Sequence, residues 1–226
     1  MTADPLDNVA WAALTGPQAR FAELHGRAAR FDPEVSVFAA LADQSDPAAW
    51  DDLADLVGPG ADAFIAGPGP VPPPGWTKVG GVTGVQLTGA DVPGVPDPEA
   101  VLLGDADLPE ILDLVERTRP GPFGKRTVEL GAYLGIRRDG RLAALAGERL
   151  RVPGWTEISA VCTDPAFRGQ GLAARLIGAV TAGLRDRGDQ PLLHAAADNT
   201  NAIRLYQRLG FVIRTPTVFG SYRAPR

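Results

Sequence analysis

The sequence of 226 residues contains one cysteine and two histidines, and this scarcity limits the chemistry of the chain. The lone Cys162 cannot form a disulfide within the chain, so we expect no internal disulfide framework. Two histidines and one cysteine are also too few for a zinc cluster built from these residues, and no structural metal is expected.

Long apolar runs and an excess of basic charge are also missing. No run approaches the roughly 20 residues that a membrane-spanning helix needs, so we expect no membrane partner. The formal net charge of -5 argues against non-specific binding to nucleic acid. The opening residues M-T-A-D-P-L-D-N lack the basic and apolar regions of a secretory signal. Together with the single cysteine, they predict a cytoplasmic protein.

Glycine and proline are abundant, with 27 and 21 residues, and the prolines cluster. One cluster covers residues 68–74 and a second covers residues 93–98, and neither stretch suits a regular element. We place a domain boundary at the second cluster. This gives an N-terminal α/β region, residues 1–98, and a second domain, residues 99–226. A strand expected over residues 79–87 is compatible with either side.

The first region shows the weaker patterns. Apolar spacing indicates a helix over residues 7–26, and β-prone residues indicate a strand at 35–38. A helix over residues 48–57 and a strand at 63–66 follow. Strand, helix and strand in this order predict a small α/β unit.

The second region is patterned more clearly. We expect a short strand at residues 100–103, a helix from Leu108 to the prolines near 120, and a shorter helix within 123–130. The Asp139-Gly140 pair predicts a tight turn joining strands 133–137 and 142–150. Further strands are expected at 156–161, 192–195, 211–214 and 218–222, with helices over 172–188 and from Asn199 to Leu209. The order predicts an α/β fold, a mixed sheet covered by helices.

The most informative stretch turns an apolar strand into a helix through R-G-Q-G-L-A, residues 168–173. The first N–H groups of a helix lack intrahelical partners and, with the helix dipole, attract anions. Arg168 adds a fixed positive charge, and Gly169 and Gly171 would let a diphosphate approach the backbone closely. The corner therefore predicts a phosphate-binding site.

Two nucleotide-binding motifs are alternatives for this corner, and the sequence favours neither. A P-loop requires G-x-x-x-x-G-K-[ST], and no Gly-Lys-Ser/Thr triplet occurs. Gly169, Gly171 and Ala174 match G-x-G-x-x-G/A, but the preceding strand follows a predicted hairpin instead of opening a βαβ unit.

A second motif follows about 25 residues later: Asn199-x-x-Ala202-x-x-Leu205-Tyr206, then Gly210-Phe211. The two motifs together resemble the GCN5-related N-acetyltransferases (GNAT). The amino-acid sequence around the glycine corner looks most like the FR47-like subgroup of this family. The resemblance covers residues 99–222. It implies the GNAT fold, whose central sheet splays open. Residues 1–98 match no family; a degenerate second acetyltransferase-like half is one hypothesis for them.

The resemblance implies acetyl-CoA as cosubstrate and assigns residues to it. The corner would bind the diphosphate, the end of the preceding strand would pair with the pantetheine amides, and Asn199 would contact the pantetheine or cap its helix. A buried strand residue is the alternative interpretation of Cys162. The residues so assigned are Val161, Cys162, Thr163, Arg168, Gly169, Gln170, Gly171, Leu172, Ala173 and Asn199.

The resemblance also assigns Tyr206 as the acid that protonates the departing thiolate, beside the alternative that it only packs in the core. The base that deprotonates the amine has two candidates, Glu157 and His194, with Glu148 behind them. Histidine commonly exchanges protons near neutral pH. A solvent-facing Glu157 and a structural His194 are the alternatives without a catalytic role.

The sequence therefore predicts an enzyme that moves an acetyl group from acetyl-CoA to a primary amine by direct transfer in a ternary complex. The acceptor is a small molecule, an amino acid or a peptide N-terminus. Transfer of a different acyl group and a non-catalytic CoA-binding sensor are the alternatives. The oligomeric state stays open, with a homodimer as one alternative.

Overall fold

One continuous sheet of 11 strands runs through the computed structural model, which describes residues 4–226. Its spatial order is β1-β2-β3-β4-β11-β5-β10-β9-β8-β7-β6. The strands are β1 (Ala22–His25), β2 (Ala28–Phe31), β3 (Phe38–Leu41), β4 (Asp62–Gly67), β5 (Thr77–Thr88), β6 (Val101–Leu102), β7 (Tyr133–Arg138), β8 (Arg141–Val152), β9 (Trp155–Thr163), β10 (Gln190–Ala196) and β11 (Val212–Arg223).

Five α-helices cover the sheet within the described residues: α1 (Val9–Leu14), α2 (Pro47–Val57), α3 (Leu108–Thr118), α4 (Leu172–Asp186) and α5 (Thr200–Arg208). Side chains at the helix starts explain two of the boundaries. The Asp46 carboxylate accepts a hydrogen bond from the Ala48 N–H at α2, and the Asn199 side chain caps α5. No helix in the part of the chain that the structure describes is long and apolar enough to cross a membrane.

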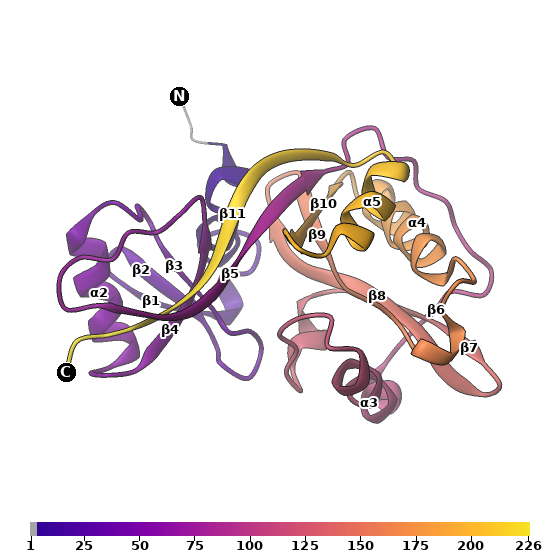
Figure 1. Ribbon diagram of the computed structural model, residues 1–226, viewed down its shortest axis with the longest axis horizontal. Helices are drawn as coiled ribbons and strands as arrows, with labels where there is room; N and C mark the ends of the chain where they lie inside the picture. Colours follow the sequence, from indigo (N-terminus) through magenta and orange to yellow (C-terminus); the bar gives the residue numbers. More distant parts are fainter. Residues whose placement is uncertain (1–3) are drawn as a thin grey trace.

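β5 and β11 form a long antiparallel ribbon that links the two halves of the molecule (Figure 1). β11 also pairs with β4 of the N-terminal half, and β5 also pairs with β10 of the C-terminal half. β5 precedes the predicted boundary at residue 98, but it lies between two strands that follow it. The sheet is therefore continuous across that boundary, and the division into two domains stays a prediction.

The N-terminal half buries residues on both faces of its strands. α2 lies on one face, where Trp50 packs edge-on against Trp76 and Tyr222. α1 lies on the other face, in a cluster that also contains Leu150 and Leu192 of the C-terminal half. The face that carries α1 is therefore turned toward the C-terminal half.

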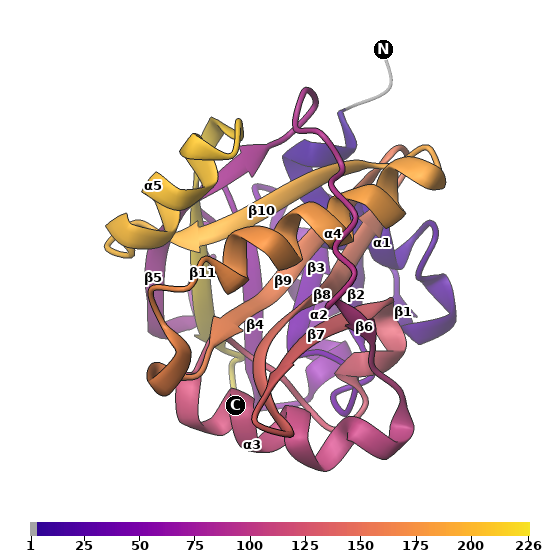
Figure 2. The same cartoon turned by 90° about the vertical axis from the view of Figure 1, so that its right-hand side faces the viewer.

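In the C-terminal half, α3 and α4 cover opposite faces of the strands β7 to β9 (Figure 2). α4 places Leu176, Ile177 and Val180 in one core cluster, and α3 places Ile111 and Leu114 in the other. Helices on both faces of a mixed sheet confirm the predicted fold class.

Several element predictions were wrong or displaced. The strand expected at 35–38 is β3 at Phe38–Leu41, and the helix expected within 123–130 is a 3₁₀ turn at Thr127–Leu130. The helix expected over residues 7–26 ends at Leu14, and the chain continues after a short 3₁₀ turn as β1, which pairs with β2. The two strands expected at 211–214 and 218–222 are one strand, β11, with a register shift between Ile213 and Thr215. Pro216 is tolerated there because that part of β11 pairs only with β5.

Candidate active site

The two central strands β9 and β10 run parallel for three residue pairs and then diverge. Trp155, Thr156 and Glu157 pair with Gln190, Pro191 and Leu192, and beyond Glu157 no pairing between the two strands remains. The backbone of residues 158–163 is thereby freed on its β10 side. An extended ligand in this opening has backbone N–H and C=O groups to pair with.

A bulge reshapes β9 just before its end. Ser159 pairs with Gly147 and Cys162 with Leu145, so β9 has one more residue than β8 between these pairs. Ala160 takes a left-handed conformation, with φ +53°, which is uncommon for a residue with a side chain. Bulges of this kind turn the backbone groups that follow, here those of Val161 to Thr163.

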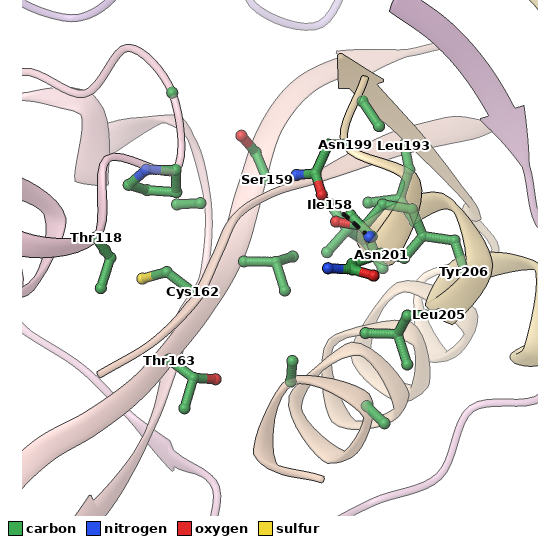
Figure 3. A pocket seen from close by; sticks show the side chains of 18 of the residues that line it. Thr118, Ile158, Ser159, Cys162, Thr163, Leu193, Asn199, Asn201, Leu205 and Tyr206 are labelled. Atoms are coloured by element: carbon green, nitrogen blue, oxygen red, sulfur yellow. Dashed lines mark hydrogen bonds between the residues drawn. The ribbon is translucent and has the colours of Figure 1, made fainter. Parts of the chain in front are cut away.

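The opening holds a cavity of about 720 Å³, within the range of ligand pockets. It brings together most of the residues predicted from the sequence: Val161, Cys162, Thr163, Arg168, Gly169, Gly171, Leu172, Ala173, His194, Asn199 and Tyr206. Figure 3 shows Cys162 and Thr163 on one side and Asn201, Leu205 and Tyr206 on the other. Gln170 is exposed outside the cavity wall, and Glu157 is buried behind it.

The glycine corner takes the backbone form that its residues predict. Gly169 and Gly171 have φ of +79° and +73°, and a Cβ built on either would meet nothing within 4 Å. Both therefore border open space on the cavity, and α4 begins directly after them at Leu172. Arg168 is exposed at the same edge. Free helix N–H groups, a guanidinium and unobstructed backbone fit a diphosphate.

Asn199 caps α5 and also lines the cavity, so the two roles expected for it are compatible in the structure. The Oδ1 atom of Asn199 accepts a hydrogen bond of 3.1 Å from the Ala202 N–H and so caps α5. Asn201 also lines the cavity. A second amide beside the cap was not predicted from the sequence.

Tyr206 and Cys162 are protonated groups on the cavity wall. Burial raises the pKa of Tyr206 to about 12 and that of Cys162 to about 11. The Tyr206 ring packs against Phe211 with centroids 6.2 Å apart. A hydroxyl held neutral at physiological pH is a hydrogen-bond donor, whereas a thiol held neutral is a poor nucleophile.

Glu157 lies at the centre of a buried polar group and is fully buried. Arg149 donates to it through Nε at 2.9 Å and Nη2 at 2.5 Å, and His194 Nδ1 lies 2.7 Å from Glu157 Oε1. Burial alone would raise the pKa of Glu157, but the ion pair with Arg149 and the contact with His194 outweigh it and hold the pKa below its usual value. Glu157 is therefore ionised and can only accept hydrogen bonds, so Nδ1 of His194 is the donor.

The opposite nitrogen of His194 faces Gln86. Gln86 Nε2 lies 3.2 Å from His194 Nε2 and donates to the Leu6 carbonyl at 3.0 Å. Its Oε1 accepts from Arg214 Nη1 at 3.2 Å. An amide nitrogen can only donate, so Nε2 of His194 is the acceptor in this contact and presents a lone pair.

A second, smaller cavity of about 150 Å³ lies between the two halves of the molecule. Arg149 and His194 line both cavities, so these two side chains form the partition between them. Gln86 and Arg214 are part of its polar lining on β5 and β11, together with Thr215 and Thr217. Its apolar wall is formed by Leu6, Val9, Ala10, Phe38 and Phe219.

The third base candidate, Glu148, lies outside the linings of both cavities. Its carboxylate is buried and pairs with Arg187 at 2.8 Å.

Sequence reasoning missed Arg149, although a charged residue inside the apolar run from Leu142 to Leu150 was a signal of a buried ion pair. Gln86 and Arg214 carried no such signal. Among residues 4–226, no group of three metal-ligating side chains is gathered.

Comparisons with known proteins match the chain to one family by sequence and by structure. The family model of the FR47-like proteins matches residues 133–219, and no curated protein matches the sequence. A crystal structure from Novosphingobium aromaticivorans, described as an acetyltransferase of the GNAT family, is 41% identical. It covers 99% of this chain and 100% of its own, with a TM-score of 0.90, so both halves of the molecule are shared.

Two more distant structures share the fold. A GCN5-related N-acetyltransferase from Kribbella flavida is 20% identical, covers 96% of this chain and 95% of its own, and has a TM-score of 0.65. A GNAT-family acetyltransferase from Colwellia psychrerythraea is 12% identical, covers 90% and 82%, and has a TM-score of 0.53.

Proposed function

The chain belongs to the GNAT acetyltransferase family, and on that premise we propose that it transfers an acetyl group from acetyl-CoA to a primary amine. The observation that carries the proposal is the partition of Arg149 and His194. It separates a cavity suited to CoA from a smaller cavity of different chemistry, so that two substrates could meet at His194. We further propose a cytoplasmic location.

The larger cavity is the proposed CoA site. The N–H groups at the start of α4 and the Arg168 guanidinium hold the diphosphate, with Gln170 at the outer rim. The freed backbone edge of Val161 to Thr163 pairs with the pantetheine arm, and the Asn199 and Asn201 amides lie along its path. Bound acetyl-CoA supplies an acyl group activated as a thioester.

We assign proton removal to His194 and a positioning role to Glu157. Glu157 has no exposed surface, and its carboxylate is occupied by Arg149 and His194. It fixes the tautomer of His194 and stabilises the imidazolium that forms when Nε2 takes the amine proton. An amine approaching from the smaller cavity would replace the Gln86 amide at Nε2.

The reaction then balances as a direct transfer. The amine nitrogen forms a bond to the carbonyl carbon, its proton passes to His194 Nε2, and the carbon–sulfur bond breaks with the electron pair left on sulfur. Backbone N–H groups of the bulged strand stabilise the charge on the carbonyl oxygen. With its pKa near 12, Tyr206 is a weaker acid than a thiol. We therefore assign it to hydrogen-bond the thiolate until solvent supplies the proton.

A thiol-release assay tests the proposal. Acetyl-CoA is supplied with a panel of amines, amino acids and peptides, and propionyl-CoA serves as the comparison donor. Release of CoA above background hydrolysis, with an acetylated product in the mass spectrum, is expected for at least one acceptor. Binding of CoA without release for any acceptor or donor would contradict the proposal and favour a CoA-binding sensor. Faster transfer from propionyl-CoA than from acetyl-CoA would show that the transferred group is a longer acyl group than acetyl.

A further inference from the structure

The smaller cavity carries information about the acceptor. We propose that it binds a small amine whose other end is a carboxylate, an acceptor of amino-acid size, and that Arg149 binds this carboxylate. The inference rests on the proposed function, because it assigns the second substrate of the same transfer. It also assigns a task to the N-terminal half, whose residues Leu6, Val9 and Phe38 line this cavity.

Size is the first argument. About 150 Å³ is well below the roughly 300–1,000 Å³ of pockets for drug-sized ligands. Since a water molecule occupies roughly 30 Å³ of the liquid, the space corresponds to about five water molecules and suits a small acceptor. An amino acid with a small apolar side chain is of this size, whereas several residues of a peptide are not.

Arg149 is the second argument. Its side chain is nine-tenths buried, and its contacts with Glu157 use Nε and Nη2. Nη1 has no hydrogen-bond partner among residues 4–226, although the residue lines the cavity. Nη1 is not among the fully buried atoms that lack a partner, so it reaches a cavity surface, and a carboxylate is the strongest complement of such a guanidinium edge.

Residues of the N-terminal half hold Arg149 in place. The guanidinium lies over the Phe38 ring, 5.0 Å from its centroid. The buried Gln18 side chain donates to the Arg149 carbonyl at 2.6 Å and accepts from the Arg151 N–H at 3.1 Å. Side chains from residues 18 and 38 thus hold both the backbone and the head group of Arg149.

Charge is the third argument. The charged groups on the cavity lining are Arg149, Arg214 and Asp7, and Asp7 is already paired with Arg214. A second ammonium group on the acceptor, as in a diamine, would therefore meet two guanidinium groups and no unpaired carboxylate on this lining. Both guanidinium groups also have carboxylate partners, Arg149 in Glu157 and Arg214 in Asp4 and Asp7, so a carboxylate is favoured only at the Nη1 edge of Arg149.

The geometry also connects the two ends of such an acceptor. Arg149 Nη2 and His194 Nδ1 contact the same Oε1 atom of Glu157, so the guanidinium and the imidazole lie side by side. In an α-amino acid, the amine and the carboxylate are attached to one carbon. A carboxylate at Arg149 therefore brings the amine to His194, and the apolar side chain faces Val9 and Phe38.

The test compares matched acceptors with the full-length protein. Alanine, valine and leucine are each assayed with acetyl-CoA beside the corresponding carboxamide, the amine without the carboxyl group, and the dipeptide alanyl-alanine. We expect kcat/KM to be about 10- to 100-fold higher for the free amino acids, as for one hydrogen bond to a charged group. Equal rates for the carboxamides or the simple amines, or faster rates for the dipeptide, would overturn the inference.

Arg149→Lys tests the residue itself. Lysine keeps the charge that pairs with Glu157 but lacks the second arm of the fork. We expect the preference for the carboxylate to fall about tenfold through KM, with CoA affinity unchanged. Arg151→Lys is the matched control, since Arg151 lies on the same strand, pairs with Asp189 and lines neither cavity. An unchanged preference in a folded Arg149→Lys variant would contradict the role of Arg149.

Calorimetric titration separates this inference from the proposed function. Valine and valinamide are titrated into the protein saturated with CoA, so that no turnover is needed. Tighter binding of valine supports the carboxylate site even if no acetyl transfer is found. Transfer to valinamide with no preference for valine, in binding or in rate, would leave the enzyme assignment intact and overturn the inference.

Discussion

At Glu157, one fully buried carboxylate contacts a guanidinium and an imidazole at once. Removing one member of a buried pair usually costs about 3 to 5 kcal/mol, because the other charge is left without compensation. Replacing His194 is milder, since the ion pair of Glu157 with Arg149 remains. His194 is therefore the member of this group whose chemical role can be tested without unfolding the protein.

His194→Ala should lower kcat by about 10²- to 10⁴-fold, the usual contribution of a general base. The deficit should shrink as pH rises, because a growing fraction of the amine is then deprotonated without help. A pH series of kcat/KM for both proteins measures this, with the melting temperature as the control for folding. A deficit that stays constant between pH 7 and pH 10 would contradict the assignment.

The positions of residues within one local motif could be predicted from the sequence. The positions of residues that lie far apart in the chain and meet only in the folded protein could not. The glycine corner and the cap of α5 are encoded within a few neighbouring positions, and the structure places them as expected. Arg149, Gln86 and Arg214 come from three strands distant in the chain. Their proximity depends on strand order, which no local pattern contains.

At the scale of elements, the strands of the N-terminal half were the hardest to predict. Phe21 and Leu24 lie three residues apart, a spacing that suits a helix, yet Ala22–His25 pairs with β2 as a strand. Its strand form is set by partners, because strand propensity mainly measures fit to neighbouring strands. The hairpin of β7 and β8 was confirmed because its turn is local: Asp139 and Gly140 have φ of +51° and +76°.

The start of α4 depends on glycine at a left-handed position. Gly171→Ala should destabilise the turn by about 1 to 2 kcal/mol, although a methyl group meets no neighbour there. We expect CoA affinity to fall as the turn distorts, measured by calorimetry. Gly183→Ala is the matched control: it lies within α4, also borders open space, and should stabilise the helix by about 0.5 to 1 kcal/mol. Equal effects of the two variants would refute the argument.

The segment between β5 and β6 is tied to α4 by Asp97. The hydrogen bond and ion pair with Arg175 lower the pKa of Asp97 to about 2. A carboxyl group whose pKa is lowered by folding stabilises the protein above its unfolded pKa, near 3.9. That contribution is lost as pH falls through about 2.

Asp97→Asn should therefore lower the free energy of unfolding by about 1 to 2 kcal/mol at neutral pH. The difference from the unmodified protein should disappear between about pH 4 and pH 2. Urea unfolding across this range measures it. Asp186→Asn, at the exposed end of α4, is the control, and a difference that persists at pH 2 would contradict the linkage.

At the scale of the whole molecule, the predicted domain of residues 99–226 lacks β5. Without β5, one edge of β10 is exposed, and β11 loses both of its neighbours. We expect this fragment alone to aggregate, since unpaired edges invite association. Co-expression with residues 1–98 should restore a soluble complex, assayed by gel filtration. A soluble, CoA-binding fragment on its own would show that the boundary separates two independent folding units.

The ribbon of β5 and β11 also sets the order in which the protein can be completed during synthesis. Ser221, near the C-terminus, pairs with Phe64, and this contact spans most of the chain. Contacts between distant residues form slowly, and a nascent chain cannot make these until β11 has been translated. The wall of the smaller cavity contains both Leu6 and Phe219. The pocket proposed for the acceptor is thus assembled only after β11 has been made, so chains that stop before β11 lack it.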